Sequence, residues 1–148
     1  MAIEPAQPIL DTDMATLFRE TLLRFELAHT RRSFEAMRAC LHDDALIESV
    51  ASDGLALGPD QTVEAIRRAF DDGVYEIGDW EYDEVEPDVV LLWTGARHRL
   101  PDRRMRDERV CRLAVGKDGL MWRVKLFRRR NEALAHLEAY GPGLGLRA

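Results

Sequence analysis

The chain has few cysteines, few lysines and no long apolar run. Its two cysteines, Cys40 and Cys111, are too few for a disulfide framework, and the apolar residues around each favour a buried free thiol. No stretch approaches the ~18 apolar residues that cross a bilayer. The first ten residues also lack the basic start and apolar segment of a signal peptide. We therefore expect a cytoplasmic protein that does not bind a membrane.

Positive charge comes almost entirely from arginine. Lys117 and Lys125 are the only lysines among 21 basic residues, and the formal net charge is -6. An acidic chain is poorly suited to general nucleic-acid binding. The arginine-rich segments 103–106 and 128–130 contain no interleaved aromatic residues. We therefore expect them to form a solvated, salt-bridged surface rather than a nucleic-acid patch.

The chain has the length and composition of one globular domain. It contains 148 residues, of which 46% are hydrophobic and 32% are charged. Residues 1–12 carry two prolines and show no periodicity, so we expect a mobile lead-in there. The glycine-rich residues 141–148 should form a flexible tail. The domain itself is expected to span residues 13–140.

The spacing of apolar residues changes along the chain from helical to extended. Steps of three and four residues predict helices over 13–30, from Ser33 onward, over 59–70 and over 131–140. Alternation predicts strands over 45–52, 55–57, 74–86, 89–99, 104–115 and 120–128. Helices followed by a series of long strands indicate an α+β fold. The helices should cover one face of an antiparallel sheet.

Three stretches, in this order, resemble the SnoaL-like branch of the nuclear-transport-factor-2-like superfamily. They are LHDDALIES after the helical hairpin, GLALGPDQTVEAIRRAF as a strand and helix, and GKDGLMWRVKLFRRRNEALAHL as the closing hairpin and helix. The resemblance covers about residues 17–137. It implies a cone-shaped fold, in which a bent antiparallel sheet wraps around an N-terminal helical hairpin and a third helix. This fold hosts isomerases, cyclases, hydrolases, dehydratases and non-enzymes, so it does not define an activity.

The resemblance also implies a homodimer, because relatives commonly pair through the outer face of the sheet. The candidate outer-face residues are Trp80, Tyr82, Leu92, Val124 and Leu126.

The best-known catalytic positions of the superfamily carry other residues in this chain. Ser49 stands where the ketosteroid isomerase relatives have an Asp base, and serine is no unassisted base near neutral pH. Phe25 and Val110 stand where those relatives have Tyr and protonated Asp donors. Lys125 stands where limonene-epoxide hydrolase relatives have an Asp. Steroid-type isomerisation and epoxide hydrolysis are therefore disfavoured, and we expect no metal or cofactor.

Strand alternation within this alignment predicts the side chains that line the cone. Arg97, Arg112 and Lys125 should make its mouth basic, and an arginine fork suits a carboxylate or phosphate. The sequence thus predicts a site for a small, anionic organic molecule. The predicted ligand-binding residues are Phe18, Leu22, Phe25, Ser49, Trp93, Arg97, Val110, Arg112, Lys125 and Phe127.

Simpler roles stay open for several of these residues. Trp93 and Phe25 can be core residues, and Ser49 can be a small filler. Arg97 and Arg112 can pair with acidic residues on neighbouring strands.

Three functions stay open at this point. The first is a ligand-binding domain without catalysis. The second is an isomerase, cyclase, hydratase, dehydratase or hydrolase acting on a small hydrophobic metabolite. Its acid or base would be Glu108, Glu26 or His29, although His29 can instead cap helix carbonyls or meet solvent. The third is a non-catalytic dimerisation module.

Overall fold

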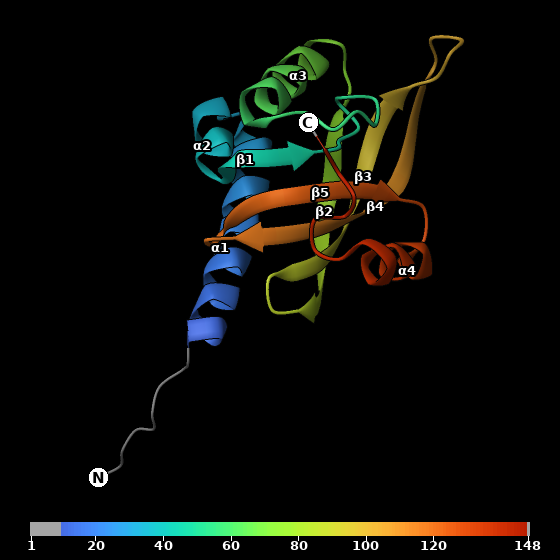
Figure 1. Cartoon of the computed structure of the whole chain (residues 1–148). Helices are drawn as coiled ribbons and strands as arrows, with labels where there is room; N and C mark the ends of the chain where they lie inside the picture. Colours follow the sequence, from blue (N-terminus) through green and yellow to red (C-terminus); the bar gives the residue numbers. More distant parts are fainter. Residues whose placement is uncertain (1–9, 148) are drawn as a thin grey trace.

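A curved five-stranded sheet forms the centre of the molecule (Figure 1). The computed structural model describes the backbone of residues 10–147 and the side chains of residues 16–77 and 80–147. β1 runs parallel to β5, and the other neighbouring strands are antiparallel. The strands are β1 (Leu41–Ile47), β2 (Tyr75–Glu86), β3 (Val89–Arg99), β4 (Met105–Lys117) and β5 (Leu120–Phe127), in the order β1-β5-β4-β3-β2.

Helices cover both faces of this sheet. α1 (Leu10–Arg31), α2 (Phe34–Ala39) and α3 (Pro59–Asp71) form an inner hydrophobic cluster with the concave face. α4 (Arg130–Tyr140) packs with an outer hydrophobic cluster on the opposite face (Figure 1). No helix in the described part of the chain is both long enough and apolar enough to cross a membrane. The arrangement is the α+β cone that the sequence predicted, except that α4 also covers the outer face and that β1 runs parallel to β5, where a fully antiparallel sheet was expected.

Local chemistry explains where α3 begins and ends. Pro59 lies in the first turn, where a backbone amide donor is not needed. Gly73 has a φ of +74°, a conformation that glycine adopts without strain. Thr62, Ile66 and Phe70 are buried, and their spacing of four residues places them on one face of the helix. That face closes one side of the cone.

The main difference from the expected elements lies at β1. The sequence predicted a strand over 45–52, but β1 is Leu41–Ile47. The chain then turns, because Ser49 and Ser52 satisfy each other's backbone amides through their hydroxyl oxygens, at 3.0 and 3.1 Å. The expected short strand 55–57 is reduced to a single bridge to the end of β1.

Apolar side chains are buried on both faces of the central strands. Val90 and Leu92 of β3 belong to the inner cluster. Leu91 belongs to the outer cluster, and Trp93 packs against it. A strand covered on both faces has apolar residues at successive positions, so alternation alone does not reveal which face points inward.

We predicted which side chains of β3, β4 and β5 point into the cone. The prediction was wrong for β3 and β5 and right for β4. Paired residues on antiparallel strands share a face of the sheet. Trp93 and Phe127 both pair with Cys111, which belongs to the outer cluster. Arg112 follows Cys111 in β4 and therefore faces inward, where it lines a cavity. The prediction had shifted β3 and β5 by one residue, which turns every side chain to the opposite face.

The residues proposed for a dimer contact were also assigned to the wrong face. Trp80, Leu92 and Val124 belong to the inner cluster, and Tyr82 packs against it. Leu126 pairs with Arg112, which faces inward. The outer face of β4 and β5 is covered by α4. The homodimer stays a prediction, but the sheet face expected for it is occupied by the chain's own helix.

Leu144 packs with the sheet, although we expected a flexible tail over 141–148, of which residue 148 lies outside the described residues. Leu144 is 1% exposed and belongs to the outer cluster. Gly141 has a φ of +75° and lets the chain turn back after α4. At the other end, α1 begins at Leu10, within the predicted lead-in. Residues 1–9 of that lead-in lie outside the described residues.

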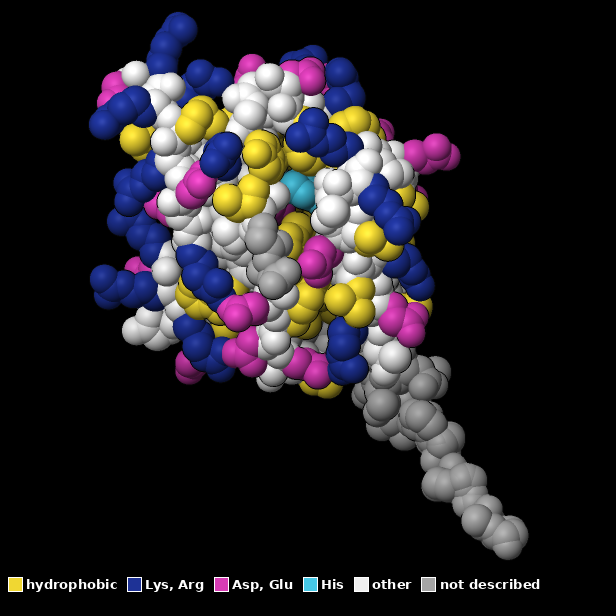
Figure 2. Space-filling model, turned by 180° about the vertical axis from the view of Figure 1, so that it is seen from behind, with side chains coloured by type: hydrophobic (Ala, Val, Ile, Leu, Met, Phe, Trp, Pro, Cys, Tyr) yellow, Lys and Arg dark blue, Asp and Glu magenta, His cyan; other side chains and the backbone are white. Residues whose placement is uncertain are grey.

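Basic and acidic side chains are paired on the surface. Figure 2 shows the two kinds intermixed around the margins of the face that is turned away in Figure 1. In the hairpin of β3 and β4, Arg97 lies 2.8 Å from Asp107, and Arg104 lies 2.6 Å from Asp102. The salt-bridged surface expected for the arginine-rich hairpin is therefore present.

The two cysteines are buried and free, as predicted. Burial raises the pKa of both thiols, that of Cys111 to about 11. Neither cysteine is therefore a reactive thiolate near neutral pH.

Candidate functional site

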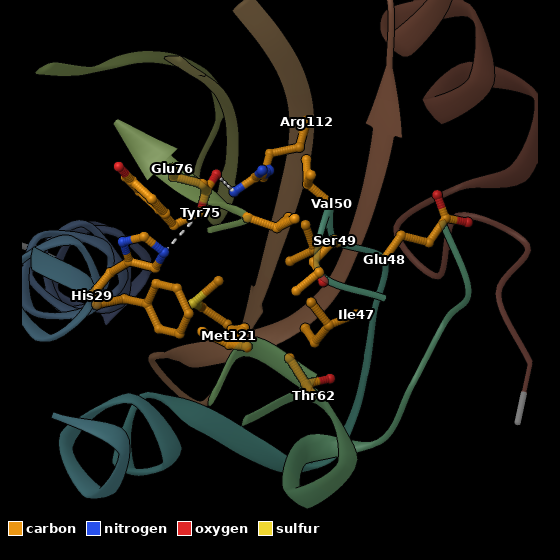
Figure 3. Close-up of a pocket in the computed structure, with 15 residues that line it drawn as sticks. His29, Ile47, Glu48, Ser49, Val50, Thr62, Tyr75, Glu76, Arg112 and Met121 are labelled. Carbon is orange, nitrogen blue, oxygen red and sulfur yellow. Dashed lines mark ion pairs between the residues drawn. The ribbon is translucent and has the colours of Figure 1, made fainter. Parts of the chain in front are cut away.

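A small cavity lies inside the cone, where α1, the turn after β1, α3 and the sheet meet (Figure 3). Most of its wall is apolar and includes Phe25 and Ile66. The space open to the centre of a water-sized sphere is about 30 Å³, which is room for one or two water molecules. The side chains of His29, Glu76 and Arg112 point toward one another across it (Figure 3). This polar group is the chemical centre of the cavity.

Arg112 of β4 is a buried cation, and two of its guanidinium nitrogens lack a hydrogen-bond partner in the described structure. Its side chain is 5% exposed, and Nη1 contacts Oε1 of Glu76. The Nε and Nη2 atoms form no hydrogen bond with any residue that the structure describes. An unpaired buried donor costs roughly 1–3 kcal/mol. The guanidinium therefore offers two N–H groups to an acceptor oxygen in the cavity.

Glu76 of β2 holds this guanidinium in position. Oε1 of Glu76 accepts a hydrogen bond of 2.9 Å from the hydroxyl group of Thr94. Oε2 lies 3.9 Å from Nε2 of His29. The carboxylate thus lies between the arginine and the histidine, and its negative charge offsets the charge of the buried guanidinium.

His29 lies near the end of α1, and its side chain is 6% exposed. The ring packs against Phe70 and Trp80, with centroid distances of 4.9 and 5.8 Å. Burial lowers the pKa of His29; Glu76 acts in the opposite direction, and the charges of Arg112 and Arg32 lower the pKa further. The imidazole is therefore neutral near pH 7 and able to accept a proton. The predicted alternative, in which His29 meets solvent, does not occur.

The structure brings together four of the residues that the sequence singled out. Phe25, His29, Ser49 and Arg112 all line the cavity. Ser49 does so from the turn after β1, where its hydroxyl oxygen lies 3.3 Å from that of Ser52. Its hydroxyl is thus already engaged in holding the turn.

Other predicted residues lie elsewhere. Phe18 and Leu22 belong to the inner cluster but do not line the cavity. Trp93 and Phe127 pack under α4. The predicted ligand-binding cations Arg97 and Lys125 do not line the cavity. Arg97 pairs with Asp107 at 2.8 Å, and Lys125 pairs at 3.0 Å with Glu48, which lies in the cavity wall.

The two remaining catalytic candidates are also outside the cavity. Glu26 accepts a short hydrogen bond from the hydroxyl of Tyr82, and burial together with this carboxylate raises the pKa of Tyr82. Glu108 lies 2.9 Å from Nε2 of His98. Neither carboxylate lines the cavity that contains Arg112.

A larger open hollow of about 650 Å³ lies next to the cavity. Val110 and Glu108 line this hollow from β4. Val50 and Ala51, in the turn after β1, line both the cavity and the hollow. The turn therefore forms the partition between the two spaces.

Glu76 is the functional candidate that the sequence did not reveal. It lies in an acidic stretch of β2, from Glu76 to Glu86, which looks like a solvated edge strand. A register shift lies between Ile77 and Glu81, so the facing of Glu76 could not be extrapolated from the rest of the strand. Only its contact with Arg112, across the intervening strand β3, shows that it is buried.

The residues described here show no cluster of three or more His, Cys, Asp or Glu side chains suited to a metal ion. Among the described residues, Glu76 contacts His29, the cation Arg112 and the hydroxyl group of Thr94. The chemistry of the cavity is therefore that of a neutral imidazole, a carboxylate and a guanidinium.

Comparison with known proteins defines the fold. No protein-family model and no curated protein matches the sequence. A candidate polyketide cyclase from Xanthomonas campestris matches in structure with a TM-score of 0.63 and 18% identity, over 82% of this chain and 97% of that one. An NTF2-like protein of unknown function from Burkholderia pseudomallei matches with a TM-score of 0.59 and 16% identity, over 80% and 95% of the two chains.

A third solved structure carries a small molecule. It is TerC co-crystallised with polyporic acid, which matches with a TM-score of 0.59 and 15% identity, over 82% of this chain and 98% of TerC. All three chains are covered almost completely. This protein therefore has the nuclear-transport-factor-2-like fold, as the sequence resemblance implied.

Proposed function

We propose that this protein binds a small organic molecule by a carboxylate or carbonyl oxygen that contacts Arg112 in the cone. The observation that carries the proposal is the pair of unengaged donors, Nε and Nη2, on a guanidinium whose side chain is 5% exposed. Two adjacent N–H donors of an arginine match the geometry of a carboxylate. Apolar walls with a few convergent polar groups are typical of small-molecule sites.

The comparisons support this proposal in one respect. TerC, which shares the fold, was co-crystallised with polyporic acid. A small organic molecule with an acceptor oxygen is the class of ligand that the free donors of Arg112 would take. The ion pair with Glu76 uses only Nη1 of the guanidinium for charge compensation, so the other two donors are available to the ligand.

A titration followed by NMR tests the proposal. Acetate, propionate and benzoate are the probes, and backbone amide shifts around Arg112 are the readout. Arg112→Lys keeps a positive charge beside Glu76 but removes the planar fork, and we expect it to weaken binding at least about tenfold. The matched control is Arg123→Lys, because Arg123 bonds to the carbonyl oxygen of Asp44 and does not line the cavity. Equal affinities in the two variants would exclude Arg112 as the anion site.

The second candidate function is proton transfer, and the position of His29 favours it. The neutral imidazole lines the same cavity as Arg112. In this reaction His29 takes a proton from a carbon next to a carbonyl group. The electron pair of the broken C–H bond forms a C=C bond, and the π pair of the C=O bond moves to the carbonyl oxygen. Arg112 stabilises the oxyanion, and Glu76 stabilises the imidazolium that forms. The proton then returns from His29 to carbon.

Deuterium exchange distinguishes this enzyme from a binding domain. Small ketones and keto acids in D2O are the probes, and loss of the α-proton signal is the readout. Catalysis by His29 predicts exchange that His29→Gln reduces by about 100-fold or more. His42→Gln is the matched control, since His42 lies near Asp118 and outside the cavity. Binding without exchange would leave the non-catalytic function.

A further inference from the structure

We propose that the ligand site has two parts, with Arg112 holding an acidic head in the cavity and the adjoining hollow holding an apolar tail. This inference rests on the proposed function and adds the class of ligand, which is an amphiphilic monocarboxylic acid. The cavity alone, at about 30 Å³, accommodates only a head group, whereas the hollow measures about 650 Å³.

One continuous wall joins the two parts. Alternate residues of a strand lie on the same face, about 7 Å apart. Arg112 lines the cavity, and Val110, the next inward residue of β4, lines the hollow. Leu126, which pairs with Arg112 on β5, also lines the hollow. A molecule held by Arg112 can therefore extend along β4 over Val110 and Leu126.

The turn after β1, which separates the cavity from the hollow, forms its hydrogen bonds within itself. Within the described chain, the hydrogen bonds of Val50, Ser52, Asp53 and Gly54 all join residues of the turn itself, 49–55. Asp53 and Gly54 have φ values of +55° and +80°. The base of the turn is anchored separately, by the bridge between Ile47 and Leu57. The turn can therefore shift as a unit without breaking its own hydrogen bonds, and such a shift merges the cavity with the hollow.

The lining of the hollow determines the chemistry of the tail. Val50, Val74, Val110 and Leu126 are partly buried and provide an apolar floor. Exposed charged residues form the rim, and they carry both signs: Asp53, Arg68, Asp72, Arg99 and Glu108. An apolar tail fits the floor, and the mixed rim does not select a second charge of one sign. The geometry therefore favours a single acidic head followed by an aliphatic or aromatic body.

A chain-length series tests the two-part site. The probes are straight-chain carboxylates from acetate to decanoate, with decan-1-ol as a probe that has the tail without the acid. We expect affinity to increase by about fourfold for each methylene group that enters the hollow. Decan-1-ol should bind far more weakly than decanoate, because it lacks the group that Arg112 contacts. If decanoate binds no tighter than acetate, the two-part site is wrong while the proposed carboxylate site stands.

Two variants locate the tail. Leu126→Ser and Val110→Ser each replace an apolar side chain in the floor of the hollow. Both should reduce the increase in affinity from acetate to decanoate at least about tenfold, while the affinity for acetate stays unchanged. Leu23→Ser is the matched control, because Leu23 lies on α1 and is 50% exposed. If affinity still increases with the length of the acid in both floor variants as it does in the unmodified protein, the tail lies elsewhere. Failure of acetate and every longer acid to bind would instead overturn the proposed function itself.

Discussion

Arg112 on β4 and Glu76 on β2 form an ion pair across the intervening strand β3, inside an otherwise apolar cone. Their side chains are 5% and 11% exposed. The two residues are 36 positions apart in the sequence, and neither belongs to the catalytic positions that the family resemblance identifies. Their contact gives the cavity a fixed charge arrangement, to which His29 adds a group that can accept a proton.

Neutralising Glu76 should destabilise the fold. Removal of one partner from a buried ion pair leaves an uncompensated charge and typically costs about 3–5 kcal/mol. We expect Glu76→Gln to lower the free energy of unfolding by about 3 kcal/mol, measured by urea denaturation. Glu81→Gln is the matched control, since Glu81 and Arg109 form an exposed pair, and it should cost less than about 1 kcal/mol. Similar losses in both variants would contradict the burial of the Glu76 pair.

The free energy of unfolding should decrease as the pH falls below the pKa of an ordinary histidine. Burial lowers the pKa of His29 in the folded protein, whereas the unfolded chain has a histidine pKa of about 6.5. Below about pH 6.5 the unfolded state therefore binds more protons, and the stability that is fully present above this pH is lost progressively until the folded-state pKa is reached.

Denaturation between pH 5.5 and 7.5 measures this effect. His29→Gln should flatten the slope of the free energy of unfolding against pH in that window. The control is His136→Gln, which should retain the slope, because the ring of His136 lies outside the cavity beside the carbonyl oxygen of Leu144. An unchanged slope in His29→Gln would mean that His29 is not held neutral by burial.

Leu144 should contribute to stability although it lies near the C-terminus. It is 1% exposed and belongs to the cluster under α4. Replacement of a buried leucine by alanine typically costs about 2–5 kcal/mol, so Leu144→Ala should lower the midpoint of urea denaturation clearly. Leu55→Ala makes the same change at a residue that is 65% exposed and should have little effect. A flexible tail would instead make the two variants indistinguishable.

Gly116 should not tolerate a side chain, because α1 packs directly on β4 there. A Cβ atom at this position would lie 2.6 Å from the ring of Phe18, which is fully buried. We expect Gly116→Ala to cost roughly 1–3 kcal/mol through overpacking, as measured by thermal denaturation. At Gly143 a Cβ atom would meet nothing within 4 Å, so Gly143→Ala should leave the melting temperature nearly unchanged. A tolerated Gly116→Ala would show that this part of the core is looser than the structure indicates.

The sequence by itself determined the order of helices and strands, and the resemblance of three ordered stretches implied the cone-shaped fold. The order of elements depends on local periodicity and on turn residues such as Pro59 and Gly73, which act where they stand in the chain. It also identified Arg112, because alternation gave the correct phase for β4. Phe25 and Ser49 were identified through the family resemblance, and His29 through its place at the end of the first helix.

Tertiary structure alone decided which face of β3 and β5 points into the cone and which acid meets Arg112. Leu91 and Leu92 are both essentially buried because helices cover both faces of the sheet, so the apolar pattern could not distinguish inside from outside. Glu76 reaches the cavity through the register of β2 and through the curl of the sheet. Both depend on contacts between residues far apart in the chain, and no local pattern encodes them.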